Sequence, residues 1–122
     1  MPAGMPPQKL RTFKYLAGFV REWARLGLAD DDLRELEFLI LADPDAGAVT
    51  TGTGGLRKLR FSPSGWRRGK SGALRIGYSH DARLAKVLVL AVYAKNDKAN
   101  LTPAERREIK QLLAALWRAE GR

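Results

Sequence analysis

Apolar residues recur every three or four positions in two stretches near the start of the chain, and this spacing predicts two helices. The first stretch holds Leu16, Phe19, Val20 and Trp23. Gly27 is expected to end that helix, because glycine readily adopts the backbone conformation that follows a helix. The second stretch holds Leu33, Leu36, Leu39 and Ile40 and stops before Pro44. Its first turn carries Asp30, Asp31 and Asp32, whose charges suit the positive end of a helix.

Four segments have the pattern of β-strands, namely residues 11–15, 56–61, 74–79 and 86–93. The first is expected at an edge of the sheet. In the second, Leu59 and Phe61 alternate with basic residues after a glycine-rich turn. The last is nearly continuous in Val and Leu, which is typical of a central strand buried on both faces.

The segment Thr102-Pro103-Ala104-Glu105 predicts the start of a third helix, with an N-cap, a proline at the first helical position and a capping-box glutamate. An apolar stripe follows at Ile109, Leu112, Leu113, Leu116 and Trp117. Together these elements predict an α+β fold: a small antiparallel or mixed sheet of about four strands, two N-terminal helices and one C-terminal helix, with the helices on one face. We expect a single domain over residues 11–119, a flexible tail at 1–10 and a short tail at 120–122.

Composition narrows the class of protein. The chain has 122 residues and no cysteine, which excludes disulfides and thiolate chemistry. Its longest apolar run, Val87–Tyr93, is shorter than the ~20 residues that a membrane-spanning helix needs. The start of the chain holds prolines and no apolar signal core. We therefore expect a soluble cytoplasmic protein.

Positive charge is concentrated in the middle of the chain. Residues 46–80 carry seven Lys or Arg and no Asp or Glu, whereas residues 1–45 have a net charge of −2 and residues 81–122 one of +4. The seven cations are Arg57, Lys58, Arg60, Arg67, Arg68, Lys70 and Arg75. Such a cluster favours a polyanionic partner, above all RNA or DNA, because each neutralised phosphate releases counterions.

Strand periodicity predicts where three of these cations lie in the fold. Lys58 and Arg60 are expected on one face of the sheet, and Arg75 joins them if the strand at 74–79 pairs beside theirs. Three cations on a rigid sheet can clamp a phosphate, and the planar arginine fork is suited to phosphate oxygens. A solvated cationic face that aids solubility is the alternative for any one of these residues.

Other chemistry finds little support. The only histidine, His80, stands beside Asp81 in an expected turn and is read as a surface residue. The acidic residues 30–32 are read as helix N-terminal charge rather than as a metal site. The segment Gly52–Lys58 lacks the spacing of a nucleotide-binding P-loop and leads into a strand, so that function is rejected.

The three tryptophans differ in their surroundings. Trp23 and Trp117 lie on helical stripes and are expected in the core. Trp66 lies in a loop of Ser, Gly and Arg, where its ring either stacks on a base or packs under the loop.

Four blocks in order resemble the HigB-type branch of the RelE/ParE toxin superfamily: Gly52–Phe61, Gly69–Gly72, Tyr93–Asn96 and Leu101–Glu105. The resemblance extends from about Arg11 to Trp117. It implies the α+β fold described above and a toxin of a type II toxin–antitoxin pair that cuts messenger RNA in the ribosomal A site. Such enzymes typically use no metal, and the 2′-hydroxyl attacks the adjacent phosphate.

The resemblance also implies residue roles. Lys58 and Arg60 would meet the scissile phosphate, Lys58 being the candidate general base, and Arg75 would stabilise transition-state charge. Lys95 would contribute a further active-site group. RNA contacts are expected from Arg57, Trp66, Arg67, Arg68, Lys70, Tyr78, Tyr93 and Asn96.

The chain departs from the family pattern at several positions. Gly77 stands where relatives commonly have a bulky apolar residue, Ala73 where they have a glycine, and Ser79 where an aromatic is often found. Because glycine weakens a strand interior, we expect a bulged strand or a reshaped pocket near Gly77. Asn96 stands where other branches use a basic residue.

The resemblance implies partners as well: the ribosome with its messenger RNA, and a HigA-type helix-turn-helix antitoxin that also binds operator DNA. Two other functions stay open at this point. A gyrase poison of the ParE kind shares the fold, although that branch generally lacks the cationic set at Lys58, Arg60 and Arg75. A non-catalytic nucleic-acid-binding module would need only the basic segment.

Overall fold

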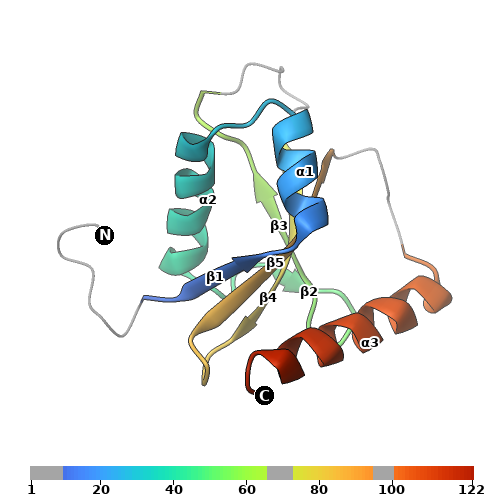
Figure 1. Cartoon of the computed structure of the whole chain (residues 1–122). Coiled ribbons are helices and arrows are strands. Elements are labelled where there is room, and N and C mark those ends of the chain that lie inside the picture. Colours follow the sequence, from blue (N-terminus) through green and yellow to red (C-terminus); the bar gives the residue numbers. More distant parts are fainter. Residues whose placement is uncertain (1–9, 66–72, 95–100) are drawn as a thin grey trace.

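A computed structural model describes residues 10–65, 73–94 and 101–122 (Figure 1). The elements in chain order are β1 (Thr12–Tyr15), α1 (Ala17–Arg25), α2 (Asp30–Ala42), β2 (Ala48–Val49), β3 (Arg57–Phe61), β4 (Leu74–Asp81), β5 (Lys86–Ala94) and α3 (Pro103–Ala119). The fold is α+β, as predicted. Its sheet has five strands in the order β1-β5-β4-β3-β2. The fifth strand is the two-residue β2, which the sequence did not reveal.

The sheet is mixed. β1 lies at one edge, as expected, and pairs with β5 in parallel, whereas the other neighbouring strands are antiparallel. The parallel pairing follows from α1 and α2, which separate β1 from the rest of the sheet in the sequence and give the chain room to cross over.

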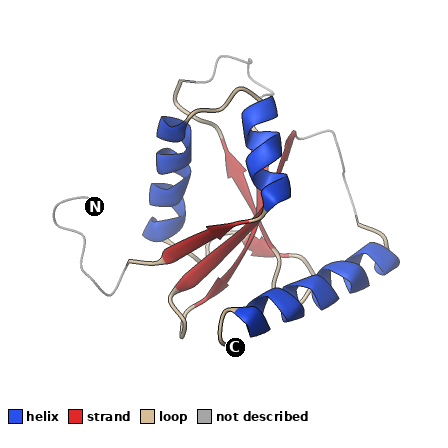
Figure 2. Ribbon diagram, in the orientation of Figure 1, coloured by secondary structure: helices blue, strands red, loops and turns tan. Residues whose placement is uncertain are grey.

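The helices cover both faces of the sheet, which corrects the prediction that they cover one (Figures 1 and 2). Phe19 and Trp23 of α1 and Leu36 and Ile40 of α2 share a core with Phe61, Ile76, Tyr78, Val87, Val89 and Val92. Leu113 and Trp117 of α3 form a second core with Leu56 and Leu88. Each face of the sheet therefore supplies apolar side chains to its own core.

β5 supplies both cores, as its continuous Val and Leu sequence predicted. Val87 and Val89 face α1 and α2, and Leu88 faces α3. Trp23 and Trp117 are buried, as expected. Leu39 and Leu112, which belong to the predicted apolar stripes, are instead 43% and 44% exposed.

The predicted helix ends are confirmed. Gly27 follows α1 with a left-handed φ of 77°, and its N–H donates to the carbonyl of Ala24. At the start of α3 the Glu105 N–H donates to the Thr102 hydroxyl at 3.1 Å, and the Thr102 N–H donates to the Glu105 carboxylate at 2.8 Å.

The pairing of β4 with β5 is irregular at Gly77/Tyr78, as the glycine suggested. Gly77 pairs with Ala91 and Tyr78 pairs with Val89, so the extra residue is Leu90, in β5 rather than in β4. A bulge of this kind places two consecutive side chains on the same face of a strand.

The C-terminal residues are bound to the sheet rather than forming a separate tail. Arg122 donates to the Asp81 carboxylate at 2.9 Å and lies over the ring of Trp117. The Lys86 ammonium donates to the Glu120 carboxylate at 3.1 Å. These contacts extend the folded unit past residue 119.

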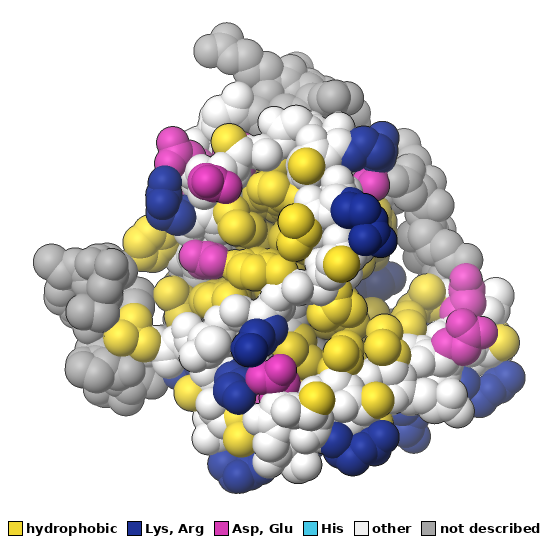
Figure 3. All heavy atoms as spheres, viewed as in Figure 1, with side chains coloured by type: hydrophobic (Ala, Val, Ile, Leu, Met, Phe, Trp, Pro, Cys, Tyr) yellow, Lys and Arg dark blue, Asp and Glu magenta, His cyan; other side chains and the backbone are white. Residues whose placement is uncertain are grey.

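The surface on the α1 and α2 side is partly apolar (Figure 3). Val20, Phe38 and Leu39 on these helices are each more than 40% exposed. Over the described ranges, no helix combines the length and the apolar character needed to cross a membrane.

Candidate functional site

The strand register brings Arg60, Arg75 and Tyr93 into one row across β3, β4 and β5. Arg60 is the direct partner of Arg75, and Arg75 is the direct partner of Tyr93. Directly paired residues of antiparallel strands project from the same face, so all three side chains share a face. The sequence predicted this face for both arginines.

Lys58 belongs to the next row on the same face, where it pairs with Gly77, and Gly77 pairs with Ala91. This is the face on which α3 packs, because Lys58 and Ile109 of α3 line the same pocket. α3 buries Leu56 and Leu88 but leaves Arg60 exposed and Lys58, Arg75 and Tyr93 half-buried. The three predicted cations therefore stand together on an accessible part of the sheet.

Across the part of the chain that the structure describes, Lys58, Arg60 and Arg75 form no ion pair. Arg75 Nη1 is buried and has no hydrogen-bond partner among these residues. A buried guanidinium nitrogen without an acceptor is costly in free energy. An anionic ligand would supply the missing acceptor.

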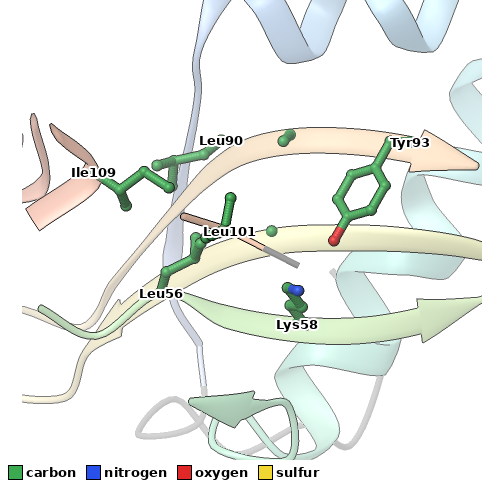
Figure 4. Close-up of a pocket in the computed structure, with 8 residues that line it drawn as sticks. Leu56, Lys58, Leu90, Tyr93, Leu101 and Ile109 are labelled. Atoms are coloured by element: carbon green, nitrogen blue, oxygen red, sulfur yellow. The ribbon is translucent and has the colours of Figure 1, made fainter. Parts of the chain in front are cut away.

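A pocket of about 200 Å³ opens beside these cations (Figure 4). Lys58 and Tyr93 lie at one end of it, and Leu90 and Ile109 lie at the other. The remaining lining residues are Leu56, Gly77, Ala91 and Leu101. Two polar side chains, those of Lys58 and Tyr93, thus mark one end of the pocket, here called its mouth, and the rest of the lining is apolar.

Burial raises the pKa of Tyr93, and the nearby positive charge of Arg75 offsets part of that increase. The side chain therefore stays a neutral phenol at neutral pH, able to donate a hydrogen bond or a proton.

Arg57, which was predicted to contact RNA, makes structural contacts away from the cationic face. It pairs with Tyr78 and so projects from the opposite face to Lys58. Its guanidinium donates to the carbonyls of Asp45 and Gly47, at 2.8 and 2.7 Å. Arg57 therefore fixes the segment before β2, and the alternation of the strand explains why it leaves the cationic face.

Tyr78 was also predicted to contact RNA, and this is wrong. Its side chain is fully buried in the core beneath α1 and α2. The hydroxyl donates to the Pro44 carbonyl at 2.9 Å and accepts from the Gly47 N–H at 3.1 Å. A ring held in this way has no free face for a base.

His80 is not the surface turn residue that the sequence suggested. It belongs to β4, and its side chain is only 4% exposed. Nδ1 lies 3.0 Å from the Asp45 carboxylate, and Nε2 accepts from Arg11 Nε at 3.1 Å. The hydrogen bond to His80 also lowers the pKa of Asp45. Both ring nitrogens are therefore occupied by structural contacts.

Six predicted site residues lie outside the described residues: Trp66, Arg67, Arg68, Lys70, Lys95 and Asn96. Among the residues that are described, no three His, Cys, Asp or Glu side chains come close enough together to hold a metal ion. None of the known protein-family models matches the chain.

Sequence reasoning missed the apolar half of the pocket. Leu56 directly precedes β3, Leu90 lies in β5, and Ile109 comes from α3. Only the placement of α3 on this face, together with the bulge at Leu90, brings them together. The available signal was Gly77, a glycine inside the strand predicted over residues 74–79.

Proposed function

We propose that this chain is the toxin of a type II toxin–antitoxin pair, a ribosome-dependent messenger RNA endoribonuclease related to the RelE/ParE superfamily. The observation that carries the proposal is the row of Arg60, Arg75 and Tyr93 beside Lys58. It agrees with the residue blocks that resemble HigB-type toxins, and the work of such a toxin would be done in the cytoplasm.

The row suits phosphodiester cleavage by the neighbouring 2′-hydroxyl. In that reaction a base removes the 2′-hydroxyl proton, the O2′–P bond forms and the P–O5′ bond breaks. The products are a 2′,3′-cyclic phosphate and a 5′-hydroxyl, which takes up a proton. Negative charge develops on the phosphoryl oxygens, so cations held on a rigid sheet stabilise the transition state.

Each residue of the site has its own part in this reaction. Arg75 and Arg60 hold the phosphoryl oxygens, and the unpartnered Nη1 of Arg75 is satisfied by one of them. Lys58, at the pocket mouth, is the candidate base. Tyr93, kept protonated by burial, donates to the phosphate or to the leaving 5′-oxygen.

A neutralising antitoxin of the HigA helix-turn-helix type is part of this proposal, and operator DNA would be reached through it. The toxin itself offers two surfaces to such a partner: the cationic face, and the exposed apolar residues Val20, Phe38 and Leu39. If the complex leaves Lys58, Arg60 and Arg75 exposed, inhibition arises from blocking access to the ribosome.

Inducible expression in bacteria tests the proposal. The wild-type chain should arrest growth and create new 5′ ends in messenger RNA that follow the codon period, and Lys58→Ala/Arg75→Ala should do neither. Arg107→Ala, an exposed cation on α3, is the matched control and should behave like the wild type. Arrest without cleavage would instead favour a gyrase poison, and gradual loss with any lost cation would favour a nucleic-acid-binding module.

A further inference from the structure

The apolar end of the pocket is not used by the phosphate chemistry. It is walled by Leu56, Leu90, Leu101 and Ile109, and it continues directly from the mouth at Lys58 and Tyr93 (Figure 4). An apolar cavity of roughly 150 Å³ holds one benzene ring. A pocket of about 200 Å³ is therefore the right size for one planar ring system.

Gly77 and Ala91 create this space. They are direct partners across β4 and β5, and both line the pocket. A Cβ atom added at Gly77 would lie 3.5 Å from Leu56 Cδ1 and 3.6 Å from the Ala91 Cβ, which are ordinary contact distances. The φ angle of Gly77 lies outside the left-handed region. Neither crowding nor backbone conformation requires glycine here, so its effect is to leave the pocket open.

The bulge adds to the same arrangement. Because Leu90 is the extra residue of β5, both Leu90 and Ala91 face the pocket. The Leu90 side chain forms part of the wall, whereas the small side chain of Ala91 leaves space beside it. Bulges commonly re-aim side chains beside active sites.

We propose that the apolar end of this pocket binds the nucleobase of a nucleotide that flanks the scissile phosphate, and that Gly77 and Ala91 determine which bases fit. This inference rests on the proposed function, which places the phosphate at Lys58, Arg60 and Arg75. A base is joined to its phosphate through a single sugar, so a phosphate held at the mouth brings a base to the pocket. The ring of Tyr93 at the mouth offers a face for stacking.

Binding of small probes to the full-length chain tests the inference without requiring cleavage. Adenosine 5′-monophosphate and ribose 5-phosphate carry the same phosphate and sugar, and only the first carries a base. The methyl NMR resonances of Leu56, Leu90, Ala91 and Ile109 should shift with the nucleotide and stay unshifted with ribose 5-phosphate.

Two variants fill the pocket from neighbouring strands, Gly77→Leu and Ala91→Leu. Either should weaken binding of the nucleotide by about ten-fold, or about 1.4 kcal/mol, and leave ribose 5-phosphate within about two-fold. Thermal unfolding checks that each variant folds. Two variants are used so that the test can still be made if one of them fails to fold.

The inference is overturned if the nucleotide leaves these methyl groups unshifted, if ribose 5-phosphate shifts them equally, or if both folded variants bind the nucleotide as the wild type does. In the first case the pocket would instead suit an apolar side chain of a protein partner. Nucleotide-specific shifts in a chain that fails to cut messenger RNA would uphold the base pocket and reject the proposed function, so the two failures are distinguishable.

Discussion

Arg60 of β3 lies directly opposite Arg75 of β4, so two guanidinium side chains share one face of the sheet as immediate cross-strand partners. Like charges in this position destabilise a sheet, by roughly 0.2–1 kcal/mol. The buried and unpartnered Nη1 of Arg75 adds to that cost. The arrangement makes physical sense if the pair exists to hold an anion.

Replacing Arg75 should therefore increase the stability of the fold and decrease its activity. We expect Arg75→Gln to raise the free energy of unfolding by about 0.5 kcal/mol, because it removes the like-charge pair. It should lower messenger RNA cleavage by about 100-fold, the usual effect of losing one preorganised donor to transition-state charge. Urea unfolding and a cleavage assay measure the two effects, and Arg107→Gln serves as control. A variant that is less stable and fully active would contradict this reading.

Inorganic phosphate should stabilise the free chain through the same pair. A ligand present at ten times its Kd adds about 1.4 kcal/mol to the free energy of unfolding. We expect phosphate to raise the melting temperature of the wild type at constant ionic strength and to have a much smaller effect on Arg75→Gln. Equal stabilisation of both would place the bound anion elsewhere.

Tyr78 should prove to be a stabilising residue and not an RNA contact. Tyr78→Phe leaves the buried Gly47 N–H without its acceptor, which should cost about 2 kcal/mol. Gly47→Ala should destabilise more strongly, because its Cβ would lie 2.8 Å from the Tyr78 hydroxyl and 2.9 Å from the Lys58 carbonyl oxygen. Both stabilities can be read from chemical denaturation. A folded Tyr78→Phe should cut messenger RNA at the wild-type rate, and loss of cleavage in that folded variant would restore the RNA role.

Asp81 should contribute to acid sensitivity. A hydrogen bond from the Leu84 N–H, together with one from Arg122, lowers the pKa of its carboxyl. The unfolded chain therefore takes up this proton at a higher pH than the folded chain does. The stabilisation is complete above the ordinary pKa of about 3.9 and is lost as pH falls through the lower folded value.

Asp81→Asn should accordingly be less stable than the wild type at pH 7, and the difference should shrink towards pH 2. Denaturation by urea at several pH values measures this. Glu108→Gln, at an exposed position of α3, is the control and should change stability little at any pH. If the loss of stability in Asp81→Asn is the same at pH 7 and pH 2, the charge of the carboxylate does not stabilise the fold.

Tyr93 should act as a neutral phenol. Burial raises its pKa above the ordinary value of about 10, so the phenol is protonated at pH 7 and at pH 9 alike. Tyr93→Phe should slow cleavage by roughly 100-fold, by the same factor at pH 7 and at pH 9. Single-turnover rates at the two pH values decide this. A wild-type rate that rises towards pH 9 only when Tyr93 is present would identify the phenolate as a base instead.

The elements of the fold were readable from local signals, and their pairing was not. Apolar periodicity and the capping box at Thr102 located the helices and four of the strands. The two-residue β2 has no periodicity to detect, and the face on which α3 packs depends on tertiary contacts. The strand alternation placed Lys58, Arg60 and Arg75 together correctly.

The same alternation already separated Tyr78 and Arg57 from those cations, because each stands an odd number of positions away from a residue on the cationic face. The resemblance, and not the periodicity, suggested that they contact RNA. His80 was misread because the strand β4 continues past it to Asp81. The register shift at Leu90 is a property of the paired strands, and no local signal in β5 marks it.

The most direct test of the central claim is cleavage of a messenger RNA on programmed ribosomes by the purified chain, with the ends of the products analysed. The account predicts cuts within the A-site codon that leave a 2′,3′-cyclic phosphate and a 5′-hydroxyl. These cuts should be absent with Lys58→Ala/Arg75→Ala and unchanged with Arg107→Ala. Cleavage that survives the double substitution, or no cleavage by the wild-type chain, would contradict it.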